Sequence, residues 1–179
     1  MKQHALTVLA PIQPTRVAAL RALLTEIGEH VADSEHLRLA ASRSTHFARF
    51  VVLDSDGQTG PRLLFTSNHD GDLASYAREL AQTLGPGLDR IFEHCAGYPP
   101  GAARDPQRLR AFLAAHGRPS DVFYVACRAT AREILEAGRI RAGFDDLLDH
   151  VPAGPAGRFA GLFQAADAPP PAPASPAQE

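Results

Sequence analysis

Apolar and polar positions along the chain recur with two periods, and each period predicts one kind of element. Residues 4–12, "HALTVLAPI", form a short apolar run typical of a strand, and Pro14 then suits the first turn of a helix. From Pro14 to Val31, apolar residues recur every three or four positions with charged residues between them. This pattern predicts a strand followed by a helix that buries one face.

The next pattern is that of a β-hairpin. Residues 45–54 and 62–68 are largely apolar runs, and the turn-forming sequence "SDGQTGP" separates them. In the first arm, apolar residues occupy both faces of the strand: Phe47, Val51 and Leu53 on one, and Ala48, Phe50 and Val52 on the other. We therefore expect both faces of the sheet to be covered.

Helical patterns fill the middle of the chain. Asp72 is expected to cap the first of three helical segments, and Asp105 the third, in which Pro106 is the first helical residue. Between these two caps, "GPG" at residues 85–87 breaks the apolar pattern into two pieces. The sequence therefore predicts a helical insert between the hairpin and the last strand.

The last elements are a strand over residues 121–127, "DVFYVAC", and a helix that a capping box opens at Thr130–Glu133. The resulting order is strand, helix, strand, strand, helices, strand, helix. This is the βαββαβ pattern of a ferredoxin-like α+β fold, an antiparallel sheet with helices on one face, here with an extra helical insert and a C-terminal helix. We assign residues 1–151 to this domain and expect the Pro- and Ala-rich residues 152–179 to be a disordered tail.

Composition narrows the classes of function. A formal net charge of −2 lacks the strong basic balance of a nucleic-acid-binding protein, so we expect no nucleic-acid partner. We expect no signal peptide and no membrane span, because no apolar run reaches about 18 residues. The two cysteines, Cys95 and Cys127, have no metal-ligand spacing. The sequence therefore predicts a cytoplasmic protein with reduced thiols, no disulfide and no metal site.

His46 and Asp70 are the candidate catalytic residues. If the hairpin loop is symmetric, Asp54 lies opposite Arg62, and the same register places His46 opposite Asp70 at the strand end. A carboxylate in this position would fix the tautomer of the imidazole, as a general base or a metal ligand requires. A structural pair at a strand end is the alternative interpretation.

Arg49, Asn68 and Tyr124 are the candidate ligand-binding residues. Arg49 and His46 are three positions apart, so they point to opposite faces of the strand unless a bulge intervenes. Because Arg49 lies among apolar residues, its guanidinium needs a partner. The partner is either an acidic residue of a helix or of a second copy, or an anionic ligand.

The strings "HALTVLAPIQPTRVAALRALLTEIG", "HFARFVVLD", "LLFTSNHDGD" and "LDRIFEHCAGYP" carry a family resemblance. With the two-sided apolar sheet, they resemble the dimeric α/β-barrel superfamily, which includes antibiotic-biosynthesis-type monooxygenases, chlorite-dismutase-like proteins and dye-decolourising peroxidases. The last three strings are also similar to uncharacterised bacterial proteins. The resemblance implies a homodimer whose second sheet closes the barrel.

The same resemblance implies a small-ligand-binding or oxidative protein, monooxygenase-like or peroxidase-like. Its members include haem-dependent, cofactor-free and non-catalytic proteins, so the cofactor stays unknown. No CxxCH motif is present, and haem ligation by a histidine such as His94 is left open. The alternative function is a non-catalytic dimeric interaction module that docks on a larger partner.

Overall fold

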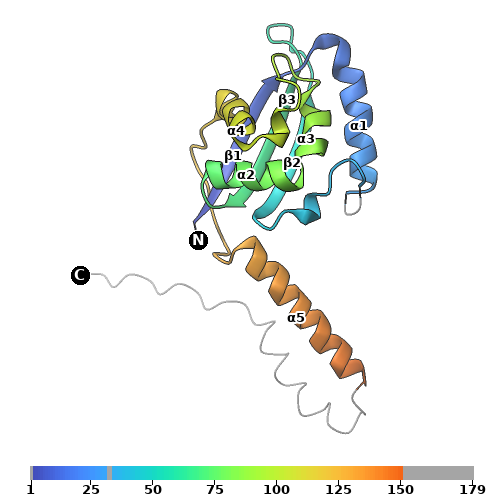
Figure 1. Cartoon of the computed structure of the whole chain (residues 1–179), viewed down its shortest axis with the longest axis vertical. Coiled ribbons are helices and arrows are strands. Elements are labelled where there is room, and N and C mark those ends of the chain that lie inside the picture. Colours follow the sequence, from blue (N-terminus) through green and yellow to red (C-terminus); the bar gives the residue numbers. More distant parts are fainter. Residues whose placement is uncertain (1, 32–33, 151–179) are drawn as a thin grey trace, which may run out of the picture. The chain divides into compact units, whose positions relative to one another are not determined.

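The computed structural model describes residues 2–31 and 34–150 (Figure 1). Residues 1–135 and 136–179 form two compact units, and the division between them falls inside the C-terminal helix. The predicted tail, residues 152–179, lies outside the described residues. In the described part, the chain is an α+β protein with a four-stranded antiparallel sheet and five α-helices.

The sheet belongs to the first unit. Its strands, in chain order, are β1 (Gln3–Pro11), β2 (Thr45–Leu53), β3 (Arg62–Asp70) and β4 (Gly117–Arg118). Their spatial order is β2-β3-β1-β4, and every neighbouring pair is antiparallel. Strand β2 is therefore an edge strand, and its first residues are open to contacts from loops and helices.

Three of the five helices in the described part of the chain begin where the sequence predicts caps. They are α2 (Leu73–Thr83), α4 (Pro106–Ala115) and α5 (Ala131–His150), and the other two are α1 (Val17–Glu29) and α3 (Gly85–Phe92). The Asp72 carboxylate accepts a hydrogen bond from the Ser75 backbone N–H, and Asp105 accepts two from the first turn of α4. The predicted caps at Asp72 and Asp105 are confirmed.

Helices α2, α3 and α4 lie over one face of the sheet (Figure 1). From that face β1 contributes Val8 and β3 contributes Phe65, both buried. Aromatic contacts connect the sheet to the helices. The ring centroids of Phe65 on β3 and Phe92 on α3 are 6.0 Å apart, and those of Phe92 and Phe112 on α4 are 5.1 Å apart. Burial of this apolar face is the main stabilisation of the first unit.

The "GPG" sequence is the start of α3, where Pro86 occupies the first turn. Gly87 allows α3 to pass close to the loop before β2. A Cβ at Gly87 would lie 2.0 Å from the carbonyl oxygen of His36, which no real side chain tolerates. The glycines that end the apolar pattern of α2 therefore also allow α3 to pack closely against the loop before β2.

The register of the hairpin differs from the prediction by one residue. Leu53, and not Asp54, lies opposite Arg62, because the loop begins one residue earlier than predicted. Asp54 belongs to the loop, and its carboxylate pairs with Arg21 at 2.6 Å. The register then shifts at His46, since Thr45 pairs with His69 and Phe47 with Asn68. His46 is thus the extra residue of a β-bulge, a feature that re-aims side chains.

The predicted strand over residues 121–127 is wrong. This segment has no regular structure, and the side chains of Val122 and Tyr124 are 87% and 83% exposed. Instead, the two residues Gly117 and Arg118 pair with β1, and the Gln3 amide donates to the carbonyls of Cys127 and Ala129 at 3.0 and 2.8 Å. The segment is thus held by hydrogen bonds from one side-chain amide and not by backbone pairing with a strand. Cys127 is exposed and does not belong to the core.

The second face of the sheet carries the other apolar residues of β2. Ala48, Phe50 and Val52 pack against the core, whereas Phe47 on the opposite face is 74% exposed. Val51 lies opposite Leu64 on this second face, and both are half-buried. The two-sided apolar pattern of β2 is therefore present, with one side in the core and the other at the surface of the chain.

Candidate functional site

A partly open cavity of about 340 Å³ lies beside the first residues of β2. It is enclosed by the loop before β2, by the bulge of β2 and by the first turn of α5, all within the first unit. Its lining residues are Leu39, Ala40, Ser42, Thr45, His46, Phe47, Ala48, Ala131, Ile134 and Leu135. The wall is mainly apolar, with one imidazole and two hydroxyl groups, which is the usual composition of a small-molecule site.

His46 is the only titratable side chain among the described residues that line this cavity. Its Nε2 lies 3.0 Å from Oδ1 of Asp70, and the two side chains are only 7% and 4% exposed. Asp70 holds the proton on Nε2, since a carboxylate only accepts. The predicted pair of His46 and Asp70 is present, reached through the bulge and not through the predicted register.

His46 lines the cavity, and its other ring nitrogen, Nδ1, is not used by Asp70. Nδ1 makes no hydrogen bond with any residue that the structure describes. It also retains some accessible surface, because it is absent from the fully buried unpaired atoms of the described residues. With Nε2 protonated, Nδ1 of the neutral ring is a hydrogen-bond acceptor. The site therefore offers a ligand a fixed, partly buried acceptor.

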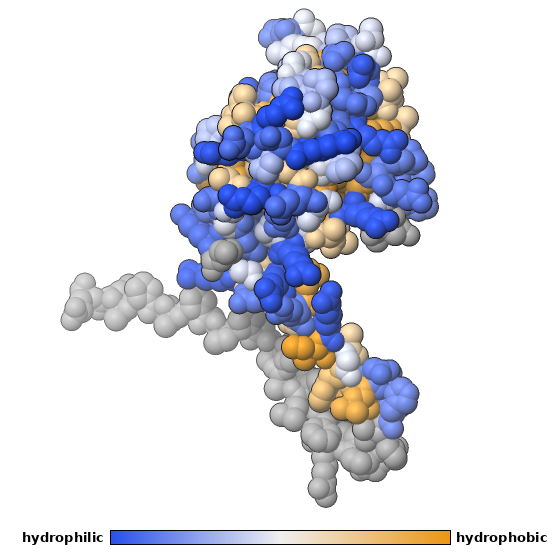
Figure 2. All heavy atoms as spheres, in the orientation of Figure 1, coloured by the Kyte–Doolittle hydropathy of each residue, from blue (hydrophilic) through white to orange (hydrophobic). Residues whose placement is uncertain are grey.

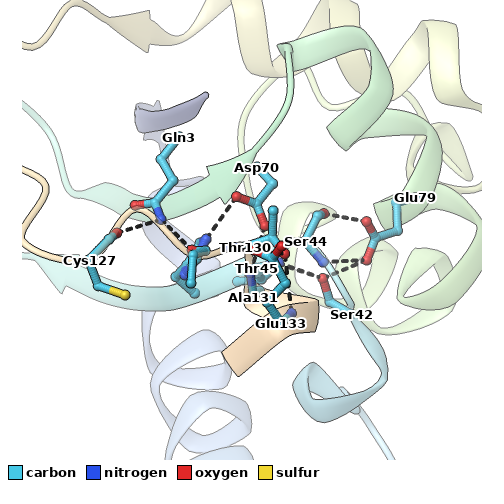
Figure 3. A network of polar contacts seen from close by, with 12 residues as sticks. Gln3, Ser42, Ser44, Thr45, Asp70, Glu79, Cys127, Thr130, Ala131 and Glu133 are labelled. Atoms are coloured by element: carbon cyan, nitrogen blue, oxygen red, sulfur yellow. Dashed lines mark hydrogen bonds and ion pairs between the residues drawn. The ribbon is translucent and has the colours of Figure 1, made fainter. Parts of the chain in front are cut away.

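Asp70 also fixes the wall that α5 contributes. Its Oδ2 accepts a hydrogen bond from the Ala131 backbone N–H at 2.8 Å (Figure 3). The predicted capping box is confirmed, because Glu133 accepts from the Thr130 N–H at 2.7 Å and Thr130 Oγ1 accepts from the Glu133 N–H at 3.2 Å. One carboxylate thus joins the end of β3, the bulge of β2 and the start of α5.

A chain of hydroxyl groups forms the floor of the cavity. Tyr76 Oη lies 3.1 Å from Thr45 Oγ1. Thr45 Oγ1 in turn lies 2.7 Å from Ser42 Oγ, which donates to Glu79 at 2.8 Å (Figure 3). Glu79 also accepts from the Ser44 hydroxyl and from the Arg43 N–H. Burial raises the pKa of Glu79, but these hydrogen bonds outweigh burial and lower it overall.

The sequence reasoning missed this chain of hydroxyls. The signal available was the run "SRST" before a strand, because serine and threonine in such a position often bond to nearby backbone groups. Thr45 N–H indeed donates to Ser42 Oγ at 3.1 Å. The distant partners Glu79 and Tyr76 have no local signal, because they come from α2.

A second histidine is buried behind the site. The His69 ring is stacked on Tyr76, with centroids 3.9 Å apart and an interplanar angle of 7°, and His69 is only 2% exposed. Neither ring nitrogen has a hydrogen-bond partner among the described residues. Burial lowers the pKa of His69 from 6.5 to about 4, so the ring is neutral at physiological pH.

The predicted ligand-binding residues are not brought to this cavity. Arg49 is exposed and has no hydrogen bond or ion pair with any residue in the described part of the chain, so the expected partner within one chain is absent. Asn68 is half-buried on the second face of the sheet. Tyr124 is 83% exposed in the irregular segment 121–127, where no strand carries it toward His46.

Other chemistry finds little support in the described residues. No group of three His, Cys, Asp or Glu side chains within residues 2–31 and 34–150 could share a metal ion. Burial raises the pKa of the Cys95 thiol to about 12, which leaves it a poor nucleophile. In the same part of the chain, no helix is long and apolar enough to span a membrane.

Comparison of the chain with known protein families, with curated proteins and with solved structures found no match.

Proposed function

We propose that this chain is a small-ligand-binding protein whose ligand occupies the cavity beside His46. The observation that carries the proposal is the pairing of an apolar enclosure with one imidazole, which is fixed by Asp70 on one nitrogen and open to the cavity on the other. Apolar walls supply most of the affinity in such sites, and a few placed polar groups select the ligand. A cavity of about 340 Å³ suits a molecule of roughly ten to fifteen heavy atoms.

The finer assignments of fold and chemistry belong to the same proposal. We propose a ferredoxin-like βαββαβ fold of the dimeric α/β-barrel type, supported by the antiparallel order β2-β3-β1-β4. A monooxygenase-like or peroxidase-like activity is supported by the sequence resemblance and by the paired His46 and Asp70, which have the arrangement of a general base. An absorbance spectrum of the purified protein tests for bound haem or flavin.

The His46→Ala variant is expected to keep the fold and to lose ligand binding. Removal of the imidazole leaves Asp70 with its bond from Ala131, so the free energy of unfolding should fall by only about 1–2 kcal/mol. The measurement is a ligand-observed NMR screen of compact apolar fragments against the wild type and the variant. Fragments that bind the wild type should lose at least tenfold in affinity for the variant.

The matched control for this experiment is His30→Ala, because His30 is an exposed histidine on the loop after α1. This control should bind the same fragments as the wild type. If the His46→Ala variant retained every fragment at wild-type affinity, the cavity would not be the binding site.

We also propose a homodimer, which would cover the second face of the sheet. Phe47 is 74% exposed on that face, and Val51 and Leu64 lie half-buried beside each other. Sheet faces with apolar rows are commonly covered by another layer. In such a dimer, Arg49 would find its partner in the second copy.

Light scattering at micromolar concentration is expected to give twice the monomer mass of 19.1 kDa. The Val51→Asp variant places a charge on the second face and should reduce this mass to that of a monomer. Gln82→Asp, on the exposed side of α2, is the control and should remain dimeric. A monomeric wild type would contradict the homodimer.

A second candidate function, the non-catalytic interaction module, is favoured by α5. Ile140 and Leu147 on this helix are 74% and 57% exposed, and apolar surface follows the helix (Figure 2). Exposed apolar stripes of this kind are typical of protein contact surfaces. The fragment screen separates the two functions, because an interaction module without a ligand site would yield no fragment that depends on His46.

A further inference from the structure

The hydroxyl chain at the floor of the cavity ends on a carboxylate, which sets the direction of its hydrogen bonds. The starting point is Glu79, whose lowered pKa keeps it an ionised carboxylate that only accepts hydrogen bonds. Ser42 must therefore give its single proton to Glu79, at 2.8 Å. The 2.7 Å bond between Ser42 and Thr45 then has Thr45 as its donor.

The proton between Thr45 and Tyr76 follows from the position of the Thr45 proton. Because Thr45 has given its proton to Ser42, its 3.1 Å contact with Tyr76 has the tyrosine hydroxyl as donor. Ser42 Oγ also accepts from the Thr45 N–H at 3.1 Å, so both of its lone pairs are occupied. Thr45 Oγ1 keeps one lone pair and has no proton left for a ligand.

The other polar side chain of the cavity wall also accepts. When the His46 ring carries one proton, the contact with Asp70 places it on Nε2, and Nδ1 is then an acceptor. Among the described lining residues there is no Lys, Arg, Asp or Glu. The polar side chains therefore present acceptors alone, on a wall that is otherwise apolar.

We infer that the cavity selects a compact, uncharged apolar alcohol, whose hydroxyl donates a hydrogen bond to Nδ1 of His46. This inference rests on the proposed function and names the ligand class of the same site. An ether would place oxygen lone pairs against the acceptors of the wall, with no side-chain donor to receive them. A carboxylate or a protonated amine would bring a full charge to a wall that is otherwise apolar.

Glu79 is then a positioning residue, because it does not line the cavity and acts through Ser42 and Thr45. Because its carboxylate accepts from Ser42, the hydroxyl protons of Ser42 and Thr45 point toward Glu79 and not toward the ligand. In the Glu79→Ala variant Ser42 loses the acceptor of its proton and can donate to Thr45 instead, which frees the Thr45 proton for the cavity. The preference for a donor should therefore weaken, even though no lining residue has changed.

The test is a set of four probes of similar size, benzyl alcohol, benzyl methyl ether, benzylamine and benzoate, with dissociation constants from calorimetry or NMR titration at neutral pH. Benzyl alcohol is expected to bind at least tenfold more tightly than each of the others. Equal binding of the alcohol and the ether, both dependent on His46, would overturn the inference and leave the proposed function standing. If no probe bound in a manner that depends on His46, the proposed function itself would fail.

The variants test the role assigned to Glu79. Glu79→Ala should lower the affinity ratio of alcohol to ether to about threefold or less, whereas Glu93→Ala, a substitution of an exposed glutamate after α3, should leave the ratio unchanged. If Glu79→Ala failed to fold, Ser42→Ala would serve instead, since it frees the Thr45 proton from the same chain. An unchanged ratio in a folded Glu79→Ala or Ser42→Ala protein would contradict the proton arrangement.

Discussion

The Asp70→Ala variant is expected to lose about 3 kcal/mol of unfolding free energy and to lose ligand binding. Asp70 is buried, and its two oxygens accept hydrogen bonds from His46 Nε2 and from the Ala131 backbone N–H. Alanine would leave both donors without a partner in a buried place, at about 1–3 kcal/mol each. Urea unfolding, followed by circular dichroism, measures the loss.

The loss of binding has a separate cause. Without Asp70, nothing holds the proton of His46 on Nε2, and the first turn of α5 loses its tie to β3. Asp121→Ala removes an exposed carboxylate and should behave as the wild type in both measurements. A change of less than about 1 kcal/mol in Asp70→Ala would mean that the two hydrogen bonds do not anchor the site.

Acid should destabilise the first unit between about pH 6.5 and pH 4 through His69. The folded protein binds a proton at this ring only near pH 4, because burial lowers its pKa, whereas the unfolded chain binds one near pH 6.5. Between these values the unfolded state holds more protons, so the free energy of unfolding falls as the pH falls. The full effect is about 3 kcal/mol, and it is complete once the pH is below about 4.

The His69→Phe variant isolates this contribution. Phenylalanine keeps an aromatic ring against Tyr76 and removes the titrating group and its two unpaired nitrogens. The variant should be less sensitive to pH than the wild type between pH 6.5 and 4.5. Below that range Glu79 adds its own acid dependence, because its pKa is lowered and its hydrogen bonds are lost on protonation.

The measurement is the urea unfolding midpoint at a series of pH values for both proteins. Burial also lowers the pKa values of His94 and His116, so a residual slope is expected in His69→Phe. Parallel pH profiles for the wild type and the variant would refute the role of His69. His30→Ala is the control, since this exposed histidine should leave the profile of the wild type unchanged.

Local chemistry predicted the helix boundaries well and the last strand badly. The caps at Asp72 and Asp105 and the capping box at Thr130 depend on atoms within three residues of one another, so the sequence alone contains them. The segment 121–127 has the composition of a strand, but strand formation needs a neighbour with unpaired backbone groups. Gly117 and Arg118 pair with β1 instead, and Gln3 ties the later segment down.

The pair of His46 and Asp70 was predicted for a partly wrong reason. A symmetric loop would place them opposite each other. In the structure the strand pairing is shifted by one residue, and the bulge at His46 brings its side chain back to Asp70. The bulge also answers why a histidine lies inside an apolar run, because it turns that side chain toward the cavity at the strand end. Arg49, on the regular part of the strand, is exposed.

The amino-acid sequence by itself determined the α+β class, the caps of the helices and the two-sided apolar pattern of β2. These features follow from the period of the side chains and from contacts between near neighbours. Tertiary structure alone decided the bulge, the cavity, the hydrogen-bonded chain from Tyr76 to Glu79 and the burial of His69. Each of these depends on groups far apart in the chain, whose distance and desolvation are set only when the helices pack on the sheet.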